Sequence, residues 1–422
     1  MISPARAVRP LWGPLDARVA LPGSKSLTNR ALLVAALAGG RSRLTGALRA
    51  DDTEAMIDSL RRLGVSIEGD GPDLAVDGGS GSFPTGRADL DARQSGTTAR
   101  FLLPVLAAVG GRYRLDGAAQ LRSRPLAEQV GALVALGAEA RGHHLPLEIE
   151  GAGLRGGSVT LPGGTSSQFA SGLLLAGPLM ADGLTLTLTG RVVSAPYLAL
   201  TTAVMQAFGA TVQRLDAATW RVEPGGYRAA DYAVEPDASA ASYFFAAAAI
   251  VPGRVVVEGL GAESLQGDLG FVDVLDSMGA AVECGADSTE VVGRRPLRGI
   301  DVDLADLSDT AQTLAVVAPF ASSATRVRGI ASSRAKETDR IAAVVTELRR
   351  CGVDAAEETD GFTVRPGPVG PARVRTYDDH RMAMSFALLG LVVPGIEIED
   401  PDCVAKTFPG FWDALKALDG LP

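Results

Sequence analysis

The most constraining feature of this 422-residue sequence is a pattern that recurs about every 70 residues. Apolar, alanine-rich stretches typical of buried helices begin near six polar residues, spaced 71, 71, 71, 71 and 70 residues apart: Ser24, Ser95, Ser166, Asp237, Ser308 and Asp378. Glycines that end a second, amphipathic kind of stretch are spaced 73, 72, 70, 73 and 68 residues apart: Gly64, Gly137, Gly209, Gly279, Gly352 and Gly420. Glycine after the last helical residue is a common helix stop. Two markers with one period indicate six copies of one structural repeat.

Each repeat is expected to hold short strands, one buried helix and one surface helix. Stretches that are apolar nearly all round must be buried, whereas Asp52–Leu63 and Lys336–Arg350 have a polar face. The alternating segment 17–21 predicts a strand before the first repeat. The glycine-rich segment 77–82 predicts a plain surface turn, because it lacks the lysine of a phosphate loop. The pattern therefore predicts an α/β fold of two three-repeat domains, with the N-termini of the buried helices turned toward a shared cleft.

Composition excludes several functional classes. Lysine and arginine number 40 against 49 acids, and a net charge of −9 argues against a general nucleic-acid surface. Cys284, Cys351 and Cys403 show no metal or disulfide spacing, and three histidines leave little scope for a metal site. The apolar runs are broken before they reach membrane-spanning length, and the N-terminus lacks the apolar core of a signal peptide. We expect a cytoplasmic protein that binds neither nucleic acid nor membrane.

The stretch PGSKSLTNR has the features of a site for a phosphate ester. Ser24 is a predicted helix N-cap, and Lys25 and Arg30 lie within two turns of it. A helix N-terminus offers free N–H groups and a partial positive charge, so it attracts anions. The two basic side chains would make the site suitable for a dianion.

Basic residues gather near the starts of other helices too. Arg100 and Arg381 lie at the mouths of apolar helices where solvent is scarce, and the arginine fork suits carboxylates and phosphates. The full set implies a ligand with several negative charges: Lys25, Arg30, Arg100, Arg124, Lys336, Arg340, Arg381 and Lys406.

Two acids stand among these bases. The segment 334–340, RAKETDR, can be a charged first turn with its acids near the helix dipole, or Lys336 and Glu337 can form an acid/base pair beside a phosphate site. Asp309 follows the predicted cap Ser308. As a carboxylate in a positive cleft, it could bind a substrate hydroxyl and accept its proton.

The order of these motifs resembles that of a known family. PGSKSLTNRALL, SGTTAR, SRPL, SSQF, SAPY, QGD, KETDR, DDHRMAM and AKTFPGFW occur in the order found in the EPSP synthases, over essentially the whole chain, and resemble the SSQ-containing group more than the SAQ-containing one. The resemblance implies a two-domain fold of six βαβαββ repeats, three per domain, with two crossovers. It implies a first domain of residues 21–234 and a second of residues 1–20 plus 235–422.

The resemblance also implies a reaction. The enolpyruvyl group of phosphoenolpyruvate would move to the 5-hydroxyl of shikimate 3-phosphate with release of phosphate, without metal, cofactor or covalent intermediate, in a cytoplasmic monomer that glyphosate inhibits. The implied catalytic residues are Asp309, Lys336, Glu337 and Lys25, with Glu337 as proton donor and Asp309 or Lys336 as acceptor. Shikimate 3-phosphate would meet Lys25, Ser26, Arg30, Ser166, Ser167, Gln168, Ser194, Tyr197, Asp309, Ser332 and Lys336. Phosphoenolpyruvate would meet Lys25, Gln94, Gly96, Arg124, Gln168, Arg340, Asp379, Arg381 and Lys406.

The sequence departs from the family pattern at four places, which bear on affinity rather than on the reaction. Gln94 and Ser332 stand where Asn is frequent, Ala195 replaces a commonly charged residue, and Phe101 stands where some members have Pro.

Two alternative functions stay open on the sequence alone. The sister enzyme that transfers enolpyruvyl to UDP-N-acetylglucosamine usually has a cysteine before the second-repeat arginine, and Gly110–Arg124 contains none. A non-catalytic phosphate-ligand binder on the same scaffold would keep the arginines but lose Asp309, Lys336 or Glu337, all of which are present.

Overall fold

The computed structural model describes residues 5–294 and 296–419, which form two compact units. The inserted unit is Gly23–Glu235, and the terminal unit combines Met1–Pro22 with Pro236–Pro422. The chain passes between them twice, within two residues of the domain bounds expected from the sequence. That the units act as domains in function stays a prediction, and each unit is described by itself.

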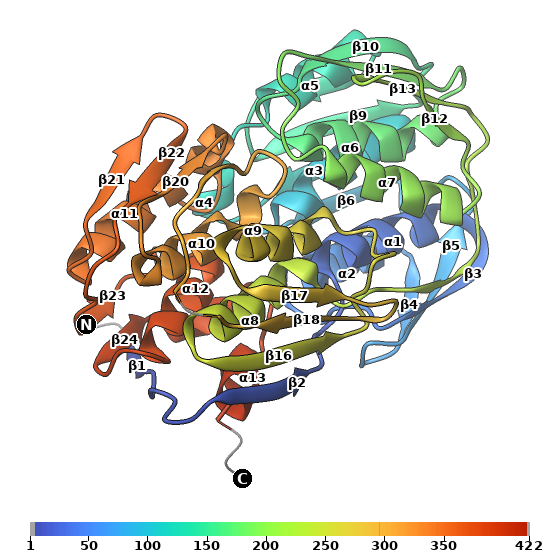
Figure 1. Cartoon of the computed structure of the whole chain (residues 1–422). Helices are drawn as coiled ribbons and strands as arrows, with labels where there is room; N and C mark the ends of the chain where they lie inside the picture. The colour runs from blue at the N-terminus through green and yellow to red at the C-terminus, as the bar shows by residue number, and fades with distance from the viewer. Residues whose placement is uncertain (1–4, 295, 420–422) are drawn as a thin grey trace. The chain divides into compact units, whose positions relative to one another are not determined.

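The inserted unit alternates short strands with helices (Figure 1). Its strands are β3 (Ala38–Thr45), β4 (Ser66–Glu68), β5 (Leu74–Gly79), β6 (Arg87–Asp91), β7 (Gly110–Asp116), β8 (Glu139–Arg141), β9 (Leu147–Ala152), β10 (Gly157–Pro162), β11 (Leu184–Thr189), β12 (Val212–Arg214), β13 (Thr219–Val222), β14 (Tyr227–Arg228) and β15 (Asp231–Ala233). Its helices are α1 (Lys25–Leu37), α2 (Asp51–Arg62), α3 (Gly96–Ala108), α4 (Ala119–Arg122), α5 (Ala127–Ala135), α6 (Ser167–Ala176), the 3₁₀ helix η1 (Gly177–Leu179) and α7 (Pro196–Ala207).

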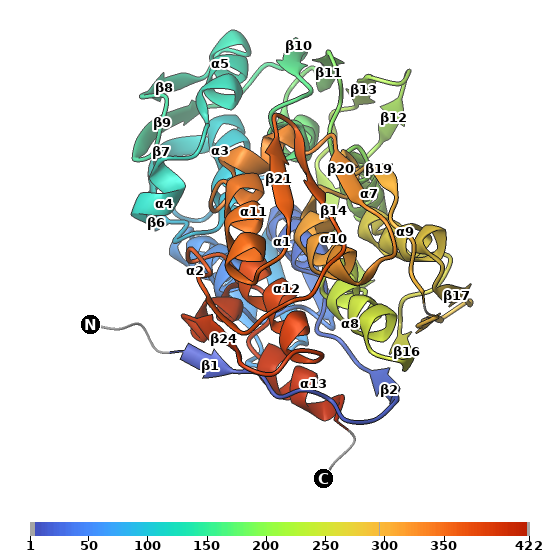
Figure 2. The ribbon, with the colours of Figure 1, turned by 60° about the vertical axis from the view of Figure 1, so that its left-hand side comes forward.

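The terminal unit is built in the same way, and Figure 2 shows α11 beside β21 within it. Its strands are β1 (Ala5–Ala7), β2 (Leu15–Val19), β16 (Gly253–Glu258), β17 (Ala281–Cys284), β18 (Ser288–Val292), β19 (Asp301–Asp303), β20 (Thr325–Arg328), β21 (Ala355–Glu358), β22 (Gly361–Val364), β23 (Ala372–Val374) and β24 (Ile396–Glu399). Its helices are α8 (Ala238–Ile250), α9 (Phe271–Met278), α10 (Ala311–Val317), α11 (Arg340–Arg350), α12 (His380–Gly390), α13 (Phe411–Ala417) and the 3₁₀ helices η2 (Gly267–Gly270), η3 (Ser308–Thr310), η4 (Ala318–Phe320), η5 (Ala331–Ala335) and η6 (Pro401–Lys406).

The described residues form six small sheets, one for each repeat. In the sheet β6–β7–β9–β8, for example, β6 pairs with β7 in parallel across α3, and β9 pairs with β7 and β8 in antiparallel. The sheets β10–β11–β13–β12 and β19–β20–β22–β21 repeat this order. The α/β class and the arrangement in six repeats predicted from the sequence are confirmed.

The first strands of the first and fourth repeats are exchanged at the two points where the chain passes between the units. β2 precedes α1 in the chain but pairs in parallel with β16, whereas β15 precedes α8 and pairs in parallel with β3. The sixth sheet is a reduced copy, in which β1 from the start of the chain pairs with β24 in place of a hairpin. Each unit therefore closes on a strand from elsewhere in the sequence.

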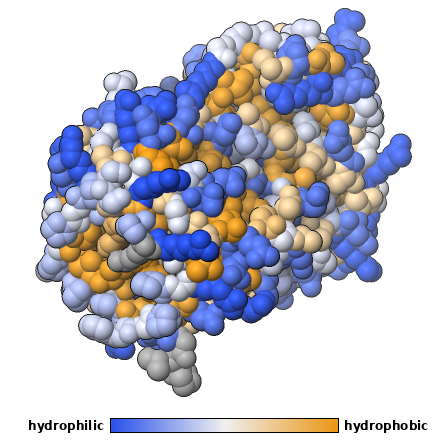
Figure 3. Space-filling view, viewed as in Figure 1, coloured by the Kyte–Doolittle hydropathy of each residue, from blue (hydrophilic) through white to orange (hydrophobic). Residues whose placement is uncertain are grey.

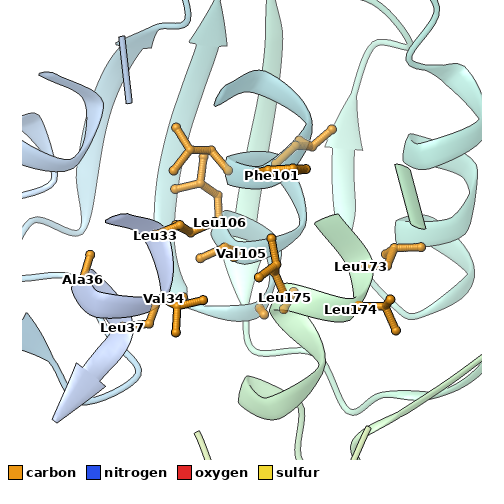
Figure 4. Close-up of a cluster of buried hydrophobic side chains, with 14 of the residues drawn as sticks. Leu33, Val34, Ala36, Leu37, Phe101, Val105, Leu106, Leu173, Leu174 and Leu175 are labelled. Carbon is orange, nitrogen blue, oxygen red and sulfur yellow. The ribbon is translucent and has the colours of Figure 1, made fainter. Parts of the chain in front are cut away.

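Each unit has a core of three buried helices. In the inserted unit, leucines, valines and alanines of α1, α3 and α6 interdigitate (Figure 4). Gly172 permits this packing, because a Cβ added there would lie 2.2 Å from the carbonyl oxygen of Arg100 on α3. In the terminal unit α8, α10 and α12 form the corresponding core. The prediction that the apolar helices are buried is confirmed.

The start and stop signals are mostly as predicted. Ser24, Ser95, Ser166 and Asp237 each accept a hydrogen bond from a first-turn backbone N–H. The stop glycines after α2, α5, α7, α9 and α11 all have positive φ, which a residue without Cβ adopts at low cost. Gly420 lies outside the described residues.

Four local predictions need correction. Ser308 is not an N-cap but the first residue of η3, so α10 begins at Ala311. The helix predicted over 336–350 begins at Arg340, because Asp339 caps it by accepting from Ala342 N–H. The strand predicted over 17–21 is Leu15–Val19.

The fourth correction concerns the predicted turn over 77–82. Residues 77–79 belong to β5, and only the following residues form the turn. A Cβ at Gly78 would lie 2.2 Å and 2.3 Å from carbonyl oxygens at the C-terminal end of α1, so glycine is needed for close strand–helix packing. A glycine run of this kind is indistinguishable from a turn by composition alone.

The three cysteines are free thiols. No helix among the described residues has the length and apolar character needed to cross a bilayer. Figure 3 shows a face on which hydrophobic side chains are interspersed with hydrophilic ones.

Candidate functional site

In the inserted unit, the predicted site residues lie around the N-termini of α1, α3, α6 and α7. Lys25 is the first residue of α1, and its Nζ lies 3.1 Å from Oδ2 of Asp52 on α2. Asp52 is a buried carboxylate, and a buried carboxylate is stable when it is paired. The pair holds the lysine ammonium at the mouth of the buried helix.

Arg30 is buried within the inserted unit. It is 1% exposed and donates to Thr201 Oγ1 (2.8 Å), to the carbonyl of Ser26 (2.8 Å) and to two further oxygens, Ser171 Oγ and the carbonyl of Tyr197. Burial lowers the pKa of its guanidinium to about 10. These bonds tie Arg30 to the predicted site residues Ser26 and Tyr197, and a direct contact with phosphate would require some of them to break.

Arg100 and Gln168 are held together. The Arg100 guanidinium donates to Gln168 Oε1 (2.7 Å) and to the Pro125 carbonyl (2.9 Å), and it stacks over Phe169. Gln129, fully buried on α5, donates to the carbonyls of Arg100 and Phe169. Arg100 is therefore fixed beside Gln168 by an amide oxygen, a backbone carbonyl and an aromatic ring.

Arg124 lies against Gly96 at the start of α3. A Cβ built on Gly96 would lie 2.9 Å from one terminal nitrogen of Arg124 and 3.1 Å from Cζ. Arg124 is 8% exposed, so the glycine gives a buried guanidinium room to pass close to the backbone. The structure thus brings two residues predicted for phosphoenolpyruvate into contact.

The other predicted residues of this unit lie near the same helix starts. Ser166 caps α6, followed by the half-buried Ser167, and Ser194 has a positive φ (55°) two residues before α7. Half-buried Gln94 lies two residues before α3.

In the terminal unit, a second cluster surrounds Asp309 on η3. Asp309 Oδ1 accepts from Lys336 Nζ (2.5 Å) and from an Arg340 terminal nitrogen (3.1 Å), and Oδ2 accepts from Arg381 (2.8 Å). Glu337 Oε2 accepts from Arg340 (2.8 Å). The predicted acids and bases of this unit are thus brought together, with Lys336 bonded to Asp309 and Glu337 bonded to Arg340.

Asp379 completes this network from the N-cap of α12. Its two oxygens accept from Arg340 at 2.8 Å and 3.2 Å, and Oδ1 also accepts from Arg381 N–H (2.9 Å). A two-point bond of this kind fixes both distance and orientation. Arg340 therefore contacts all three carboxylates of the cluster.

The charges in this cluster shift one another's pKa. Burial disfavours ionised Asp309, but Arg381, Lys336 and Arg340 outweigh it and hold the pKa of Asp309 well below its usual range. The pKa of Lys336 is lowered as well, by burial first and then, against the attraction of Asp309, by the nearby guanidinium groups. Asp309 is accordingly a firmly ionised carboxylate, and Lys336 is a lysine that gives up its proton more readily than usual.

Two more predicted residues lie in the neighbouring 3₁₀ helices. Lys406 is 5% exposed at the end of η6, and Ser332 is half-buried in η5. Among the described residues, no group of three His, Cys, Asp or Glu side chains is arranged to bind a metal ion.

Sequence reasoning missed several residues of these clusters. Tyr243 on α8 accepts from Arg381 through its hydroxyl (3.4 Å), and burial raises the pKa of this phenol to about 12. Tyr243 is the only tyrosine in an otherwise alanine- and phenylalanine-rich stretch, which was a usable signal. No comparable sequence signal marked Asp52 or Gln129, because a first-turn acid and a lone amide are ordinary helix residues.

Comparison with known proteins agrees with this geometry. The model of the EPSP synthase (3-phosphoshikimate 1-carboxyvinyltransferase) family matches residues 12–415. A 3-phosphoshikimate 1-carboxyvinyltransferase from Nostoc punctiforme is 46% identical over 94% of this chain and 95% of its own, and one from Nostoc sp. PCC 7120 is 45% identical over 98% and 99%. The solved EPSP synthase of Acinetobacter baumannii superposes with a TM-score of 0.84 at 27% identity, over 98% of both chains. The chain therefore belongs to the EPSP synthase (3-phosphoshikimate 1-carboxyvinyltransferase) family.

Proposed function

We propose that this chain transfers the enolpyruvyl group of phosphoenolpyruvate to the 5-hydroxyl of shikimate 3-phosphate and releases phosphate. The observation that carries the proposal is the Asp309 cluster, in a chain that belongs to this family. It offers carboxylates and a lysine of lowered pKa within one bonded network. A phosphate-ligand binder would need the bases but gains nothing from a cluster of buried acids, which cost free energy to desolvate.

Binding of the anionic groups would fall to the helix N-termini. Lys25 and the capped starts of α1 and α6 supply N–H groups and positive charge for the phosphate of shikimate 3-phosphate. Arg124 is the corresponding candidate for phosphoenolpyruvate, with Arg340, Arg381 and Lys406 of the terminal unit. The two clusters would act on one pair of substrates.

The chemistry requires two proton transfers. As the 5-hydroxyl oxygen bonds to C2 of phosphoenolpyruvate, the methylene carbon must gain a proton and the hydroxyl must lose one. Glu337 is our candidate donor. In the free protein it accepts from Arg340, so it must first take up a proton, which weakens that bond.

Of the two proton acceptors that the sequence left open, we favour Lys336. Asp309 is a poor base because three cations stabilise its charge, whereas Lys336 has a lowered pKa, so it reaches the neutral amine that can accept a proton more readily than an ordinary lysine does. The tetrahedral ketal phosphate so formed would then lose a methyl proton and break its bond to phosphate. No step calls on a metal or an organic cofactor.

The test is a phosphate-release assay with phosphoenolpyruvate and either shikimate 3-phosphate or UDP-N-acetylglucosamine, with and without a chelator. We expect release with shikimate 3-phosphate alone, and no effect of the chelator. Release only with the nucleotide sugar would replace the proposal by the sister activity. Loss of activity on chelation, restored by a divalent ion, would contradict the metal-free mechanism.

We further propose that the protein acts as a cytoplasmic monomer with these two small molecules as its partners. The support is the sequence argument above. Light scattering coupled to size exclusion would test the monomer, with a mass near 43.4 kDa expected.

A further inference from the structure

Backbone strain in this protein is concentrated beside the predicted site. Among the described residues, the non-glycine residues with positive φ are Ser80, Arg93, Ser194, Tyr377, Asp378 and Asp400. All but Ser80 lie within three residues of the start of a helix that carries a predicted site residue. Such conformations cost free energy and persist when neighbouring groups hold them in place.

The most strained of these segments leads into α12. Tyr377 and Asp378 are consecutive, with φ of 56° and 55°. They directly precede Asp379, whose carboxylate binds Arg340 and the backbone N–H of Arg381. Any relaxation of residues 377–378 would therefore displace Asp379 and the first turn of α12, where Arg381 lies.

A carboxylate from another helix holds this segment. Glu347 on α11 has a side chain with 0% exposure. Its Oε2 accepts from the backbone N–H of Arg375 (3.0 Å), and its Oε1 accepts from the Tyr377 hydroxyl (2.7 Å). Oε2 also forms an ion pair with Arg350, whose Nε lies 3.0 Å away. Two hydrogen bonds and this ion pair offset the cost of burying the charge.

The position of Glu347 on its helix matters. It lies seven residues after Arg340, so both side chains emerge from the same face of α11. Arg340 binds Asp379 just after the strained pair, and Glu347 binds Arg375 and Tyr377 before and within it. One rigid helix therefore fixes the segment at both ends.

We propose that Glu347 and Tyr377 are positioning residues for the proposed reaction, which set the placement of Asp379 and Arg381 toward phosphoenolpyruvate. The inference rests on the function proposed above. Glutamine cannot replace Glu347, because an amide has one acceptor oxygen where both carboxylate oxygens are in use. Phenylalanine at 377 would keep the ring and lose the bond.

The test compares Glu347→Gln and Tyr377→Phe with Tyr227→Phe. Tyr227 is a matched control, because its buried hydroxyl also donates a 2.8 Å hydrogen bond, to the Leu175 carbonyl at the far end of α6 in the other unit. In both test variants we expect the KM for phosphoenolpyruvate to rise about tenfold, with the KM for shikimate 3-phosphate within twofold. The KM for phosphoenolpyruvate of the double variant should not exceed that of Glu347→Gln alone, because both substitutions remove the same Tyr377–Glu347 hydrogen bond.

Equal rises in both KM values, or changes below twofold in both test variants, would overturn the proposal. So would an equal phosphoenolpyruvate effect in Tyr227→Phe. Should Glu347→Gln fail to fold, Tyr377→Phe can still be compared with Tyr227→Phe, because Tyr377 is half-exposed. Hydrogen exchange of the backbone amides of residues 376–384 gives a readout independent of activity. Exchange there should be faster in Tyr377→Phe than in wild type, even if the wild-type enzyme proves inactive on these substrates. Unchanged exchange would show that the Tyr377–Glu347 hydrogen bond does not hold this segment.

Discussion

The two clusters hold their basic residues in opposite ways. In the inserted unit, Arg30 and Arg100 bond to hydroxyl, carbonyl and amide oxygens, which carry no charge. In the terminal unit, Lys336, Arg340 and Arg381 bond to three carboxylates. Lys25 is the exception in the inserted unit, because it pairs with Asp52, whereas every one of these three cations in the terminal unit bonds to a carboxylate.

The difference indicates that the arginines of the inserted unit serve mainly to bind anions and that the Asp309 cluster of the terminal unit serves mainly in proton transfer. A cation held by neutral groups keeps its attraction for phosphate, because its charge is oriented but not compensated. A balanced network attracts anions less, but it fixes acids and bases at set distances, as proton transfer requires. We therefore expect changes at Arg124 of the inserted unit to act mainly on KM, and changes at the proton-transfer residues Lys336 and Glu337 of the terminal unit to act mainly on kcat.

The largest expected effect is on turnover, from Glu337→Gln. The substitution keeps size and removes the acid, so kcat should fall on the order of 10²–10⁴-fold, while the KM for shikimate 3-phosphate changes little. Steady-state kinetics check this. Glu357→Gln, at a partly exposed acid of the same unit that binds Arg334, is the control and should leave kcat unchanged. Weaker binding at unchanged turnover in Glu337→Gln would show that the acid binds substrate and does not donate the proton.

The next effect is on stability, from Asp309→Asn. Removing one partner of a buried ion network costs about 3–5 kcal/mol, and urea unfolding measures the loss. Asp52→Asn in the inserted unit is the comparison. Asp52 pairs with Lys25, whereas Asp309 contacts three cations, Lys336, Arg340 and Arg381, so the loss at Asp52 should be the smaller one. An equal loss in both variants would remove the contrast between the clusters.

The pH dependence of that loss follows from the lowered pKa of Asp309. A carboxyl with a depressed folded pKa contributes stability above its unfolded value of about 3.9, and the contribution disappears as the pH falls below that value toward the folded pKa. The difference between wild type and Asp309→Asn should thus be constant from pH 7 to 5 and shrink below pH 4. A difference that shrank between pH 7 and 5 would show that Asp309 is not held ionised.

The sequence alone predicts the repeats well and the clusters only in part. Periodic caps and glycines predict helices because their physics is local: Ser24 and Gly64 need only their own turn. The exchange of β2 and β15 could not be predicted, because strand pairing depends on which segments meet in space. The depth of Arg30 and the partnership of Glu347 with Tyr377 are likewise tertiary facts, set by the packing of α7 and α11.

A smaller, more selective effect is expected from Arg124→Ala. Loss of a charge-assisted contact costs about 1.5–3 kcal/mol, so the KM for phosphoenolpyruvate should rise roughly 10- to 100-fold with little change in kcat. Lys336→Ala in the terminal unit should show the reverse pattern, with kcat falling most. If Arg124→Ala lowered kcat as strongly as KM rose, the division between binding and chemistry would fail.

The smallest effect concerns Gly96. The terminal nitrogens and Cζ of Arg124 occupy the space beside this glycine, 2.9–3.1 Å from an added Cβ. Gly96→Ala must therefore displace a flexible guanidinium by a few tenths of an ångström. Phosphoenolpyruvate should bind a few-fold more weakly, and glyphosate, which is longer, about tenfold more weakly still. Inhibition constants against phosphoenolpyruvate measure both. Gly131→Ala on α5, where an added Cβ meets nothing within 4 Å, should change neither. Equal weakening of substrate and inhibitor would mean that the methyl acts only through Arg124, and the inserted unit would then distinguish the two ligands by charge alone.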